Sequence, residues 1–363
     1  EVLLHLYEES GPDMLEQLRG MFAFAIWDAR SRQLFCARDR VGKKPFYFTY
    51  SGGRFCFASE PRALFVDPTV QINVDASAIR TYLALGYVPS AKSAFSGLHR
   101  LLPGHSLVVD KLGLKQRRYW SLEYEPKREV SKLDALEELR YRLEDCVRLR
   151  LESDVPLGAF LSGGTDSSVV VALLAQFGAK VKTFSIGFED TSYNELPYAR
   201  LVADRYGTDH HEFMVHPELL GIAPRLAWHY GEPYADSSAI PTYELARLAS
   251  EHITVALTGD GGDETFAGYR RYRAQWAKHS YDQLPKGFRD AVGAGLKLLP
   301  GATGSRGFLY DLERFFAKSD ELGQTQYANW FGFFGGRRAD LNSAFAESTD
   351  QEELAELEDA FSS

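Results

Sequence analysis

Short apolar runs in the second half of the chain alternate with segments of helical periodicity. This alternation restricts the possible folds more than any other feature of the sequence. The apolar runs that read as strands are VPLGAFL (155–161), VKTFSIGF (181–188), HHEFMV (210–215) and ITVALT (253–258). The segments with helical spacing are 131–153, 166–178, 195–207 and 240–252. Strands that alternate with helices predict an α/β fold with a doubly wound parallel sheet. Such folds bind ligands beyond the carboxyl ends of their strands, so the loops at those ends are the first candidates for a functional site.

The first 120 residues follow a different pattern, rich in aromatic and β-branched runs with turn residues between them. Strands are predicted at 21–28, 33–39, 44–50 and 54–60. Their short spacing is typical of hairpins, so this part is predicted to be α+β with antiparallel sheets. Two short helices separated at Gly11-Pro12 are expected before the strands, and a helix that Asp75 can cap is expected at 75–86.

The segment SLEYEPKREVS at 121–131 is charged, contains a proline and has no apolar period. Because segments of this kind connect domains, it divides the chain into predicted domains at 1–121 and 132–363. The length of 363 residues agrees with about two domains. The part of the chain beyond residue 280 is predicted to be helical and polar.

Composition excludes several classes of protein. Hydrophobic residues make up 45% and charged residues 25%, which is the balance of a soluble globular protein. No run of eighteen apolar residues is present and the acidic start EVLLHLYEES is unlike a signal peptide, so we expect a cytoplasmic protein without a membrane partner. A net charge of −9 disfavours nucleic acid as a partner. Cys36, Cys56 and Cys146 are too few and too scattered for a disulfide framework or a zinc site, so reduced thiols, buried or half-buried, are expected.

The first candidate loop is SGGTDSS at 162–168, between the strand at 155–161 and the following helix. Its glycines allow a tight turn that brings backbone N–H groups close to a ligand, and the helix N-terminus adds positive potential, so the loop suits a phosphate group. Asp166 would repel a bare anion, but it fits a site in which Mg²⁺ lies between the carboxylate and the phosphates. The alternative is an ordinary strand-to-helix turn, because glycine, serine and aspartate also cap helices. The loop lacks a Walker A lysine, GxGxxG and GxSxG, so it offers no basis for those nucleotide-binding or hydrolase motifs.

The second candidate loop is GDGGDETFAGYRR at 259–271, directly after the strand at 253–258. Its first ten residues include three acids and four glycines. Glycines let the backbone approach a ligand, and clustered carboxylates suit a metal ion or acid–base chemistry. The alternative is a solvated acidic turn, which is the weaker interpretation once the first loop is considered with it.

These motifs resemble those of a known family. SGGTDSS, TFSIGF and GDGGDETFAGY, in this order, resemble the synthetase domain of glutamine-hydrolysing asparagine synthetases, and EPYADSSAIPTYELAR (232–247) resembles the segment ahead of the second loop. The start of the chain, from EVLLHLYEES through KKPFYF to FASEPRALF, resembles the glutaminase domain of the same enzymes. The resemblance extends from residue 1 to about residue 275. It implies an N-terminal-nucleophile fold for the first domain and an ATP-pyrophosphatase (PP-loop) fold for the second.

The resemblance also implies which residues form the site. The residues implied to bind ATP are Phe160, Ser162, Gly163, Gly164, Asp166, Ser167, Ile186, Thr258 and Gly259. Asp166 and Asp263 are the implied ligands of Mg²⁺. Asp260 and Glu264 are the implied catalytic acids, Asp260 close to the activated carboxylate and Glu264 behind the metal ligands.

The implied enzyme is an ATP-dependent ligase with glutamine, aspartate and ATP as substrates. A carboxylate of aspartate would attack the α-phosphorus of MgATP to give an acyl-adenylate and pyrophosphate, and ammonia from glutamine would then displace AMP and give asparagine. One alternative keeps this chemistry but changes the carboxylate, as in relatives that close lactam rings or amidate other acids. The family also implies a homodimer.

Two further alternatives belong to other classes. A pyrophosphatase that acts on tRNA bases is disfavoured by the acidic charge and by the lack of a CxxC pair. A non-catalytic interaction protein is disfavoured by the intact acids Asp166, Asp260 and Asp263.

Two departures from the family indicate an internal fragment of a longer enzyme. The family's glutaminase nucleophile is a cysteine at the mature N-terminus, whereas this chain begins with Glu1, and Cys36 and Cys56 are each predicted within a strand. The family's later block with a catalytic lysine is also missing. We therefore expect both domains to be incomplete at the ends of the chain.

Three smaller patterns lead to structural expectations. The charged runs at 38–40 and 43–44 are expected to form structural ion pairs rather than to contact glutamine or ammonia. The histidines at 210–211 are adjacent on a predicted strand, so they point to opposite faces and cannot share a metal ion. His229 and His252 are expected in helices.

Overall fold

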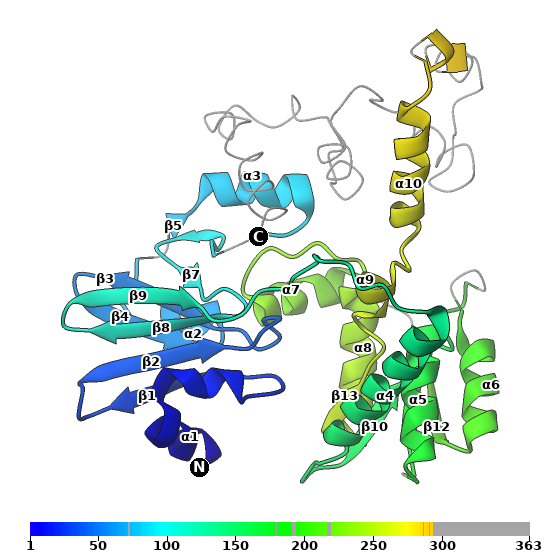
Figure 1. The fold of residues 1–363 in the computed structure, drawn as a ribbon, viewed down its shortest axis with the longest axis horizontal. Coiled ribbons are helices and arrows are strands. Elements are labelled where there is room, and N and C mark those ends of the chain that lie inside the picture. Colours follow the sequence, from blue (N-terminus) through cyan, green and yellow to red (C-terminus); the bar gives the residue numbers. More distant parts are fainter. Residues whose placement is uncertain are drawn as a thin grey trace. The chain divides into compact units, whose positions relative to one another are not determined.

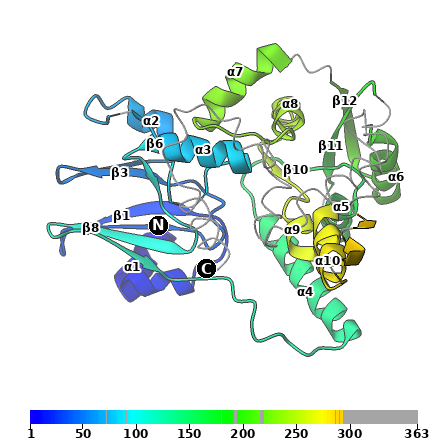
Figure 2. The same ribbon diagram turned by 90° about the horizontal axis from the view of Figure 1, so that it is seen from above.

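The computed structural model describes residues 1–292 except 72, 90, 179, 191–193, 216–218, 286 and 290 (Figures 1 and 2). Within these residues the chain forms two compact units. The first contains Glu1–Glu125 and Ala227–Ala235, and the second contains Pro126–Leu226 and continues from Asp236. The division between Glu125 and Pro126 lies in the charged segment at 121–131, but nothing in the sequence indicated that residues 227–235 belong to the first unit.

The first unit combines short helices with antiparallel strands (Figure 1). The helices are α1 (Val2–Ser10), the 3-10 helix η1 (Gly11–Glu16), α2 (Pro61–Phe65) and α3 (Ala76–Leu85). A sheet of order β1-β2-β8-β9 contains β1 (Ala23–Asp28), β2 (Gln33–Arg38), β8 (His105–Asp110) and β9 (Gly113–Arg118). A sheet of order β4-β3-β7 contains β3 (Tyr47–Ser51), β4 (Arg54–Ala58) and β7 (His99–Arg100). A small pair joins β5 (Asn73–Val74) to β6 (Phe95–Ser96).

The predicted antiparallel sheets are confirmed, but the strands do not pair as one series of neighbouring hairpins. β1 with β2 and β3 with β4 are hairpins, whereas β2 pairs with β8 and not with β3. Burial explains this pairing, because Phe35 packs with Met14 on one side of β2 while Cys36 packs with Phe48 on the other. A strand that is covered on both sides needs a central place in its sheet. β9 was not predicted, since its last residues KQRR are exposed and polar and conceal the strand pattern.

Asp75 caps α3 as predicted. Its Oδ1 accepts hydrogen bonds from the backbone N–H groups of Ser77 (2.9 Å) and Ala78 (3.1 Å). Loss of an N-cap of this kind costs about 1 kcal/mol, so we expect Asp75→Ala to lower the free energy of unfolding by that amount and Asp75→Asn to change it little. Chemical denaturation of the three proteins checks this, and equal stability of the two variants would contradict the capping role.

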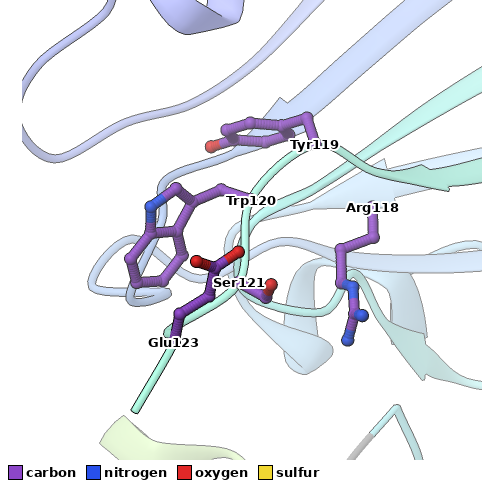
Figure 3. A pocket seen from close by; sticks show the side chains of 5 residues that line it. All are labelled: Arg118, Tyr119, Trp120, Ser121 and Glu123. Atoms are coloured by element: carbon purple, nitrogen blue, oxygen red, sulfur yellow. The ribbon is translucent and has the colours of Figure 1, made fainter. Parts of the chain in front are cut away.

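The segment after β9 lines a pocket of about 520 Å³. Figure 3 shows the lining side chains of Arg118, Tyr119, Trp120, Ser121 and Glu123. The Tyr119 hydroxyl donates a hydrogen bond to the carbonyl of Arg38 at 2.6 Å, which holds the end of β9 against β2. None of the site residues predicted from the sequence lines this pocket, so its position does not identify the functional site.

The second unit has the predicted doubly wound α/β architecture (Figure 2). Its parallel strands, in the order β12-β11-β10-β13, are β10 (Leu157–Phe160), β11 (Lys182–Gly187), β12 (Asp209–Met214) and β13 (Val255–Leu257). Its helices include α4 (Lys132–Arg150), α5 (Thr165–Gln176), α6 (Leu196–Tyr206), α8 (Ala239–Ala249), α9 (Gly262–Phe266) and α10 (Arg270–Asp282). α7 (Leu219–Tyr230) ends in the first unit.

The order of the strands creates a topological switch between β10 and β13. From β10 the chain passes through α5 to β11 and then to β12, and it later returns to β13 on the other side of β10. The core beneath α5 includes the fully buried Ala159, Val171 and Leu174. Because β10 and β13 are parallel neighbours, the loops that follow them leave the same edge of the sheet, which is where such folds bind ligands.

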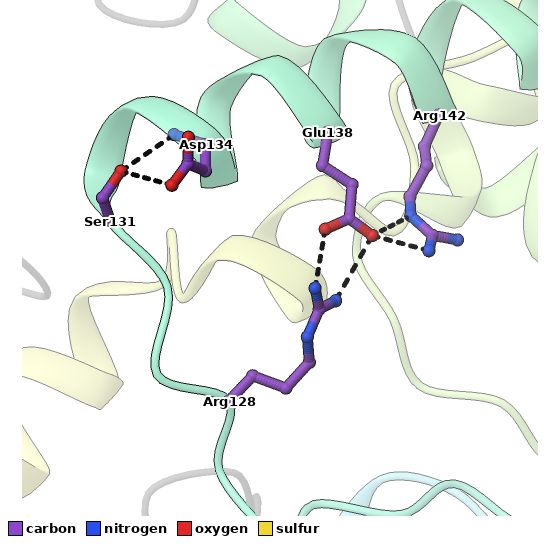
Figure 4. Close-up of polar contacts among 5 residues, drawn as sticks. All are labelled: Arg128, Ser131, Asp134, Glu138 and Arg142. Atoms are coloured by element: carbon purple, nitrogen blue, oxygen red, sulfur yellow. Dashed lines mark hydrogen bonds and ion pairs between the residues drawn. The ribbon is translucent and has the colours of Figure 1, made fainter.

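A polar network orders the start of α4 (Figure 4). The Ser131 hydroxyl accepts a hydrogen bond from the backbone N–H of Asp134 at 3.2 Å, and Glu138 accepts hydrogen bonds from Arg128 and Arg142. The Arg128 bonds, followed by those of Arg142, lower the pKa of Glu138 from 4.5 to about 2. These side chains lie at the surface, so the network orients the chain that enters α4 and is expected to add little stability.

Some local predictions need correction. The second N-terminal helix, η1, is a 3-10 helix. α8 ends at Ala249, so His252 lies in the turn before β13 and not in a helix, whereas His229 lies in α7 as expected. The backbone turns there because Ile253 packs into a core with Phe184 and Ala249. The helical prediction beyond residue 280 falls mostly on residues from 293 onward, which lie outside the described part of the chain.

Candidate functional site

The loop after β10 turns sharply into α5. Gly163 has a φ of 81°, in the left-handed region that favours glycine, and a Cβ there would lie 2.5 Å from backbone and side-chain atoms of Tyr198. Glycine is therefore required both for the turn and for the close approach of α6.

Serine hydroxyls close this loop on itself. The Ser167 hydroxyl accepts a hydrogen bond from the Ser162 backbone N–H at 3.3 Å and lies 3.0 Å from the Ser162 hydroxyl, which in turn accepts a bond from the Gly164 N–H at 3.2 Å. The Ser168 hydroxyl donates to the Gly164 carbonyl at 2.6 Å. The first turn of α5 still presents the N–H groups of an N-terminus that lack acceptors within the helix, so the loop keeps its positive potential for a phosphate group.

The loop after β13 meets the first loop at the N-terminus of α5. A Cβ on Gly259 would lie 2.7 Å from the backbone nitrogen of Ser167, and a Cβ on Gly262 would overlap the carboxylate of Asp166. The Asp166 carboxylate therefore lies against the backbone of the residue that precedes Asp263. The two loops predicted from the sequence are thus in direct contact.

Asp263 lies in the short helix α9, and its carboxylate packs on a further glycine. A Cβ on Gly268 would overlap Oδ1 of Asp263, and the Gly268 N–H donates to the Asp263 carbonyl at 3.0 Å. The chain folds back over Asp263 because Ala267 adopts a left-handed conformation with a φ of 56°. Side-chain freedom at Asp263 therefore depends on the absence of a side chain at Gly268.

The other two acids of this loop have different partners. Asp260 is exposed, and its carboxylate accepts a hydrogen bond from the Thr258 hydroxyl at 2.9 Å. Glu264 accepts a hydrogen bond from the Tyr269 hydroxyl at 2.6 Å, and the Arg271 guanidinium lies 3.8 Å from the centroid of the Tyr269 ring. Glu264 is thus held by Tyr269, whose ring in turn contacts Arg271, and the sequence predicted no role for either residue. Both residues could have been predicted from the sequence, since they lie in the same motif at 259–271.

Tyr269 controls the ionisation of Glu264. Its hydrogen bond is the main cause that lowers the pKa of Glu264, and Glu264 in return raises the pKa of Tyr269 to about 12. We expect Tyr269→Phe to raise the pKa of Glu264 toward its ordinary value of 4.5, so that the carboxylate takes up its proton at a higher pH. An NMR titration of the glutamate carboxyl carbons checks this. Tyr281→Phe is the control, because that hydroxyl donates to the carbonyl of Arg289 instead, and an equal shift in both variants would contradict the prediction.

The two residues implied to contact adenine lie at the ends of neighbouring strands. Phe160 pairs with Phe184 in the register of β10 and β11, and Ile186 lies two residues further toward the carboxyl end of β11. The Phe160 side chain packs in the core that contains Phe184 and Ala249, so only its backbone is suited to contact a ligand.

The acids suit a metal ion that a nucleotide helps to hold. No group of three or more His, Cys, Asp or Glu side chains that could bind a metal occurs among the residues described above. Mg²⁺ is commonly bound by one or two carboxylates together with substrate phosphates. Asp166 and Asp263 therefore fit Mg²⁺ bound together with phosphates rather than an ion held by the protein alone.

The cysteines are free thiols, buried or partly buried, as predicted. Cys36 lies in β2 and Cys56 in β4, so the predicted strand positions of both are confirmed. Burial raises the pKa of the Cys36 thiol to about 12, which makes it unreactive at neutral pH.

The side chains of Arg38 and Asp39 in the charged run at 38–40 contact backbone groups. The Arg38 guanidinium donates to the carbonyls of Gly42, Lys44 and Leu101. The buried Asp39 accepts hydrogen bonds from the backbone N–H groups of Lys43 and Lys44, both at 2.9 Å. The Arg38 guanidinium thus binds backbone carbonyls, and the Asp39 carboxylate binds backbone N–H groups of a tight turn.

The two adjacent histidines point to opposite faces of the sheet, as predicted. His210 Nδ1 lies 2.8 Å from the Thr183 hydroxyl, whereas the His211 ring stacks on Phe184 with a centroid distance of 5.1 Å. They therefore do not form a shared metal site.

Comparison with known proteins follows the division seen in the fold. Residues 138–356 match a family model described as asparagine synthase, and residues 1–120 match a glutamine amidotransferase domain. A putative glutamine-hydrolysing asparagine synthetase 2 of Methanocaldococcus jannaschii is 38% identical over 304 residues, which cover 82% of this chain and 58% of that protein. The glutamine-hydrolysing asparagine synthetase 1 of Bacillus subtilis is 35% identical over 292 residues, covering 80% of this chain and 46% of that protein.

A relative with a different name shows a similar level of identity. The amidase chyE of Penicillium rubens is 34% identical over 326 residues, covering 79% of this chain and 46% of that protein. The chain thus spans about half the length of the curated relatives it matches.

No helix among the described residues has the length and apolar character needed to cross a membrane.

Proposed function

This chain belongs to the asparagine synthase family, and from that premise we propose that it is an ATP-dependent ligase that forms asparagine from aspartate. The main support is the contact between the loops after β10 and β13, with the Asp166 carboxylate against Gly262 at the switch point of a parallel sheet. In this proposal residues 132–363 contribute the synthetase domain and residues 1–121 a glutaminase-like domain that supplies ammonia from glutamine.

The chemistry has two steps. An aspartate carboxylate attacks the α-phosphorus of ATP, so that an acyl-phosphate bond forms and pyrophosphate leaves. Ammonia then attacks the acyl carbon, AMP leaves and the amide is formed with loss of a proton. The acyl-adenylate hydrolyses readily in water, so a source of ammonia within the same protein is an advantage.

We assign the first loop to the phosphates of ATP. Ser162, Gly163, Gly164 and Ser167 shape the turn, and the N-terminus of α5 provides N–H donors for the negative charge that develops during adenylation. Asp166 and Asp263 would hold Mg²⁺, which neutralises phosphate charge when it is bound.

The remaining predicted residues surround this centre. We assign the backbones of Phe160 and Ile186 to adenine, and Thr258 with Gly259 to further nucleotide contacts. We assign the exposed Asp260 to a role beside the activated carboxylate, and the hydrogen bond from Thr258 holds its side chain in one orientation. Glu264, held by Tyr269, supports the position of α9 and thereby of Asp263.

A second candidate function keeps the adenylation and changes the acceptor. The relatives include a protein named as an amidase at 34% identity, close to the 35% of a named asparagine synthetase. An ATP-dependent ligase acting on another carboxylate, including one that closes a lactam ring, is therefore the alternative. The free thiols and the use of ATP support a cytoplasmic location for either enzyme.

Identification of the nucleotide product tests the proposal. The full-length protein is incubated with MgATP, ammonium and aspartate, and we expect AMP and pyrophosphate that depend on aspartate. AMP formed only with another carboxylate would support the second candidate. ADP as the product, or no turnover with any acceptor, would contradict adenylation.

A further inference from the structure

Residues 227–235, which we call the anchor segment, pack in the first unit although they follow most of the second unit in the sequence. The Arg62 guanidinium lies 4.9 Å from the centroid of the Trp228 ring, and the Ala235 N–H donates to the Gly86 carbonyl at 3.1 Å. Gly231, with a φ of 66°, lies beside the ring of Pro61. Because these contacts are spread along its whole length, the anchor segment is an integral part of the first unit.

Glu232 is the buried centre of the anchor segment, with a side chain only 5% exposed. Its Oε2 accepts hydrogen bonds from Nη2 of Arg100 at 2.6 Å and from the backbone N–H of Ala94 at 3.0 Å. Arg100 also donates to the Val88 carbonyl at 2.6 Å. Burial, followed by the charge of Glu232, raises the pKa of the nearby Tyr47. Glu232 therefore joins β3 and β7 to Ala94.

The buried ion pair between Glu232 and Arg100 contributes more to fixing one geometry of the anchor segment than to the free energy of unfolding. Two buried charges lose their hydration, and well-packed apolar residues are often at least as stable in the same place. A carboxylate that meets a guanidinium fork and a backbone N–H can, however, be satisfied in only one position. Glu232 thus sets the register of the anchor segment on the first unit.

The anchor segment is followed almost at once by α8. The Asp236 carboxylate accepts a hydrogen bond from the Ser238 N–H at 2.8 Å, and the Asp236 carbonyl accepts one from the Ala239 N–H at 3.1 Å. Further along α8, Ala249 and Leu245 pack with Phe160 on β10, the strand that leads to the first loop of the candidate site, and with Phe184 on β11. The position of the anchor segment, which Glu232 fixes, therefore constrains the start of α8 through a short turn. α8 covers β10 and β11.

We propose that Glu232 is a positioning residue that couples the first unit to the nucleotide site of the second. It acts through Arg100 on the anchor segment, and through that segment on α8. The coupling to nucleotide rests on the function proposed above, whereas the mechanical link to α8 does not. Coupling of this kind is reciprocal, so nucleotide bound in the second unit should also stabilise the first.

Amide hydrogen exchange of the full chain tests the link without any substrate. Glu232→Gln keeps the size of the side chain and removes the charge that Arg100 needs. We expect at least about tenfold faster exchange both at 88–101 and at 239–249, with protection at 239–249 largely regained in Glu232→Asp. The control is Glu251→Gln, a change of the same kind at an exposed residue just beyond α8, which should leave both segments as they were. Faster exchange confined to 88–101, or no change, would overturn the link.

The same measurement with MgATP tests the coupling. In the wild-type chain MgATP should slow exchange both at 162–168 and at 88–101, and in Glu232→Gln it should slow exchange only at 162–168. Slowing only at 162–168 in the wild type, or at both segments in the variant, would overturn the coupling. No slowing at 162–168 in the wild type would instead contradict the proposed ATP site, and the substrate-free comparison would still decide the link.

Discussion

Asp166→Asn is expected to reduce ATP-dependent AMP formation by roughly 10³-fold. The carboxylate lies against Gly262 beside Asp263, and asparagine has nearly the same shape, so the change removes a charge and not a packing contact. A neutral amide would be a poor Mg²⁺ ligand. Without the metal ion, the negative charge of the triphosphate would not be neutralised. Rates of AMP formation, and calorimetric binding of ATP with and without Mg²⁺, measure both consequences.

The control for Asp166→Asn is the same change at an exposed acid of the same unit. Asp204→Asn on the outer part of α6 removes one negative charge without touching either loop, so it should leave AMP formation within about twofold of the wild type. Mg²⁺-dependent ATP binding that survives in Asp166→Asn would show that this carboxylate is not a metal ligand.

Much of the second unit could be predicted from the sequence, because local pattern and tertiary fold agree there. β10 is short and apolar, β11 is short and largely buried, and glycine-rich loops mark the ends of β10 and β13. The rule for ligand sites in parallel sheets predicts from these elements that the two loops lie together. The contact of Gly262 with Asp166 agrees with that expectation.

The parts that escaped prediction depend on contacts between residues far apart in the sequence. The pairing of β2 with β8 follows from burial on both sides of Phe35 and Cys36, which periodicity alone does not reveal. The anchor segment carries no local signal, because Glu232 reads as a surface acid until Arg100 is placed beside it. Tyr269 was overlooked for the same reason, since its hydroxyl matters only when the turn at Ala267 brings it back to Glu264.

The glycines of the second loop show how residue type and site chemistry are connected. Gly261 has a φ of 91° and open space around it, so it serves the backbone conformation. Gly262 and Gly268 do not have positive φ values, so a left-handed backbone is not the reason for glycine at these positions. They are needed for space, since the carboxylates of Asp166 and Asp263 occupy the positions that a Cβ would take.

Gly268→Ala is therefore expected to impair the site without unfolding the protein. The new methyl group would displace the Asp263 carboxylate, and a misplacement of about 1 Å in a catalytic constellation can cost about 10²-fold in rate. AMP formation should fall by about that factor and Mg²⁺-dependent ATP binding should weaken, while the thermal midpoint changes little because Asp263 can rotate away.

Gly287→Ala is the matched control for Gly268→Ala, because open space surrounds that glycine and its φ is not positive. It should leave AMP formation unchanged and keep or slightly raise the thermal midpoint. If Gly268→Ala lowered the thermal midpoint strongly, the glycine would be serving the fold of the loop. If it lowered neither the rate nor ATP binding, the position of the Asp263 carboxylate would be irrelevant to the reaction, and the assignment of Asp263 as a metal ligand would be wrong.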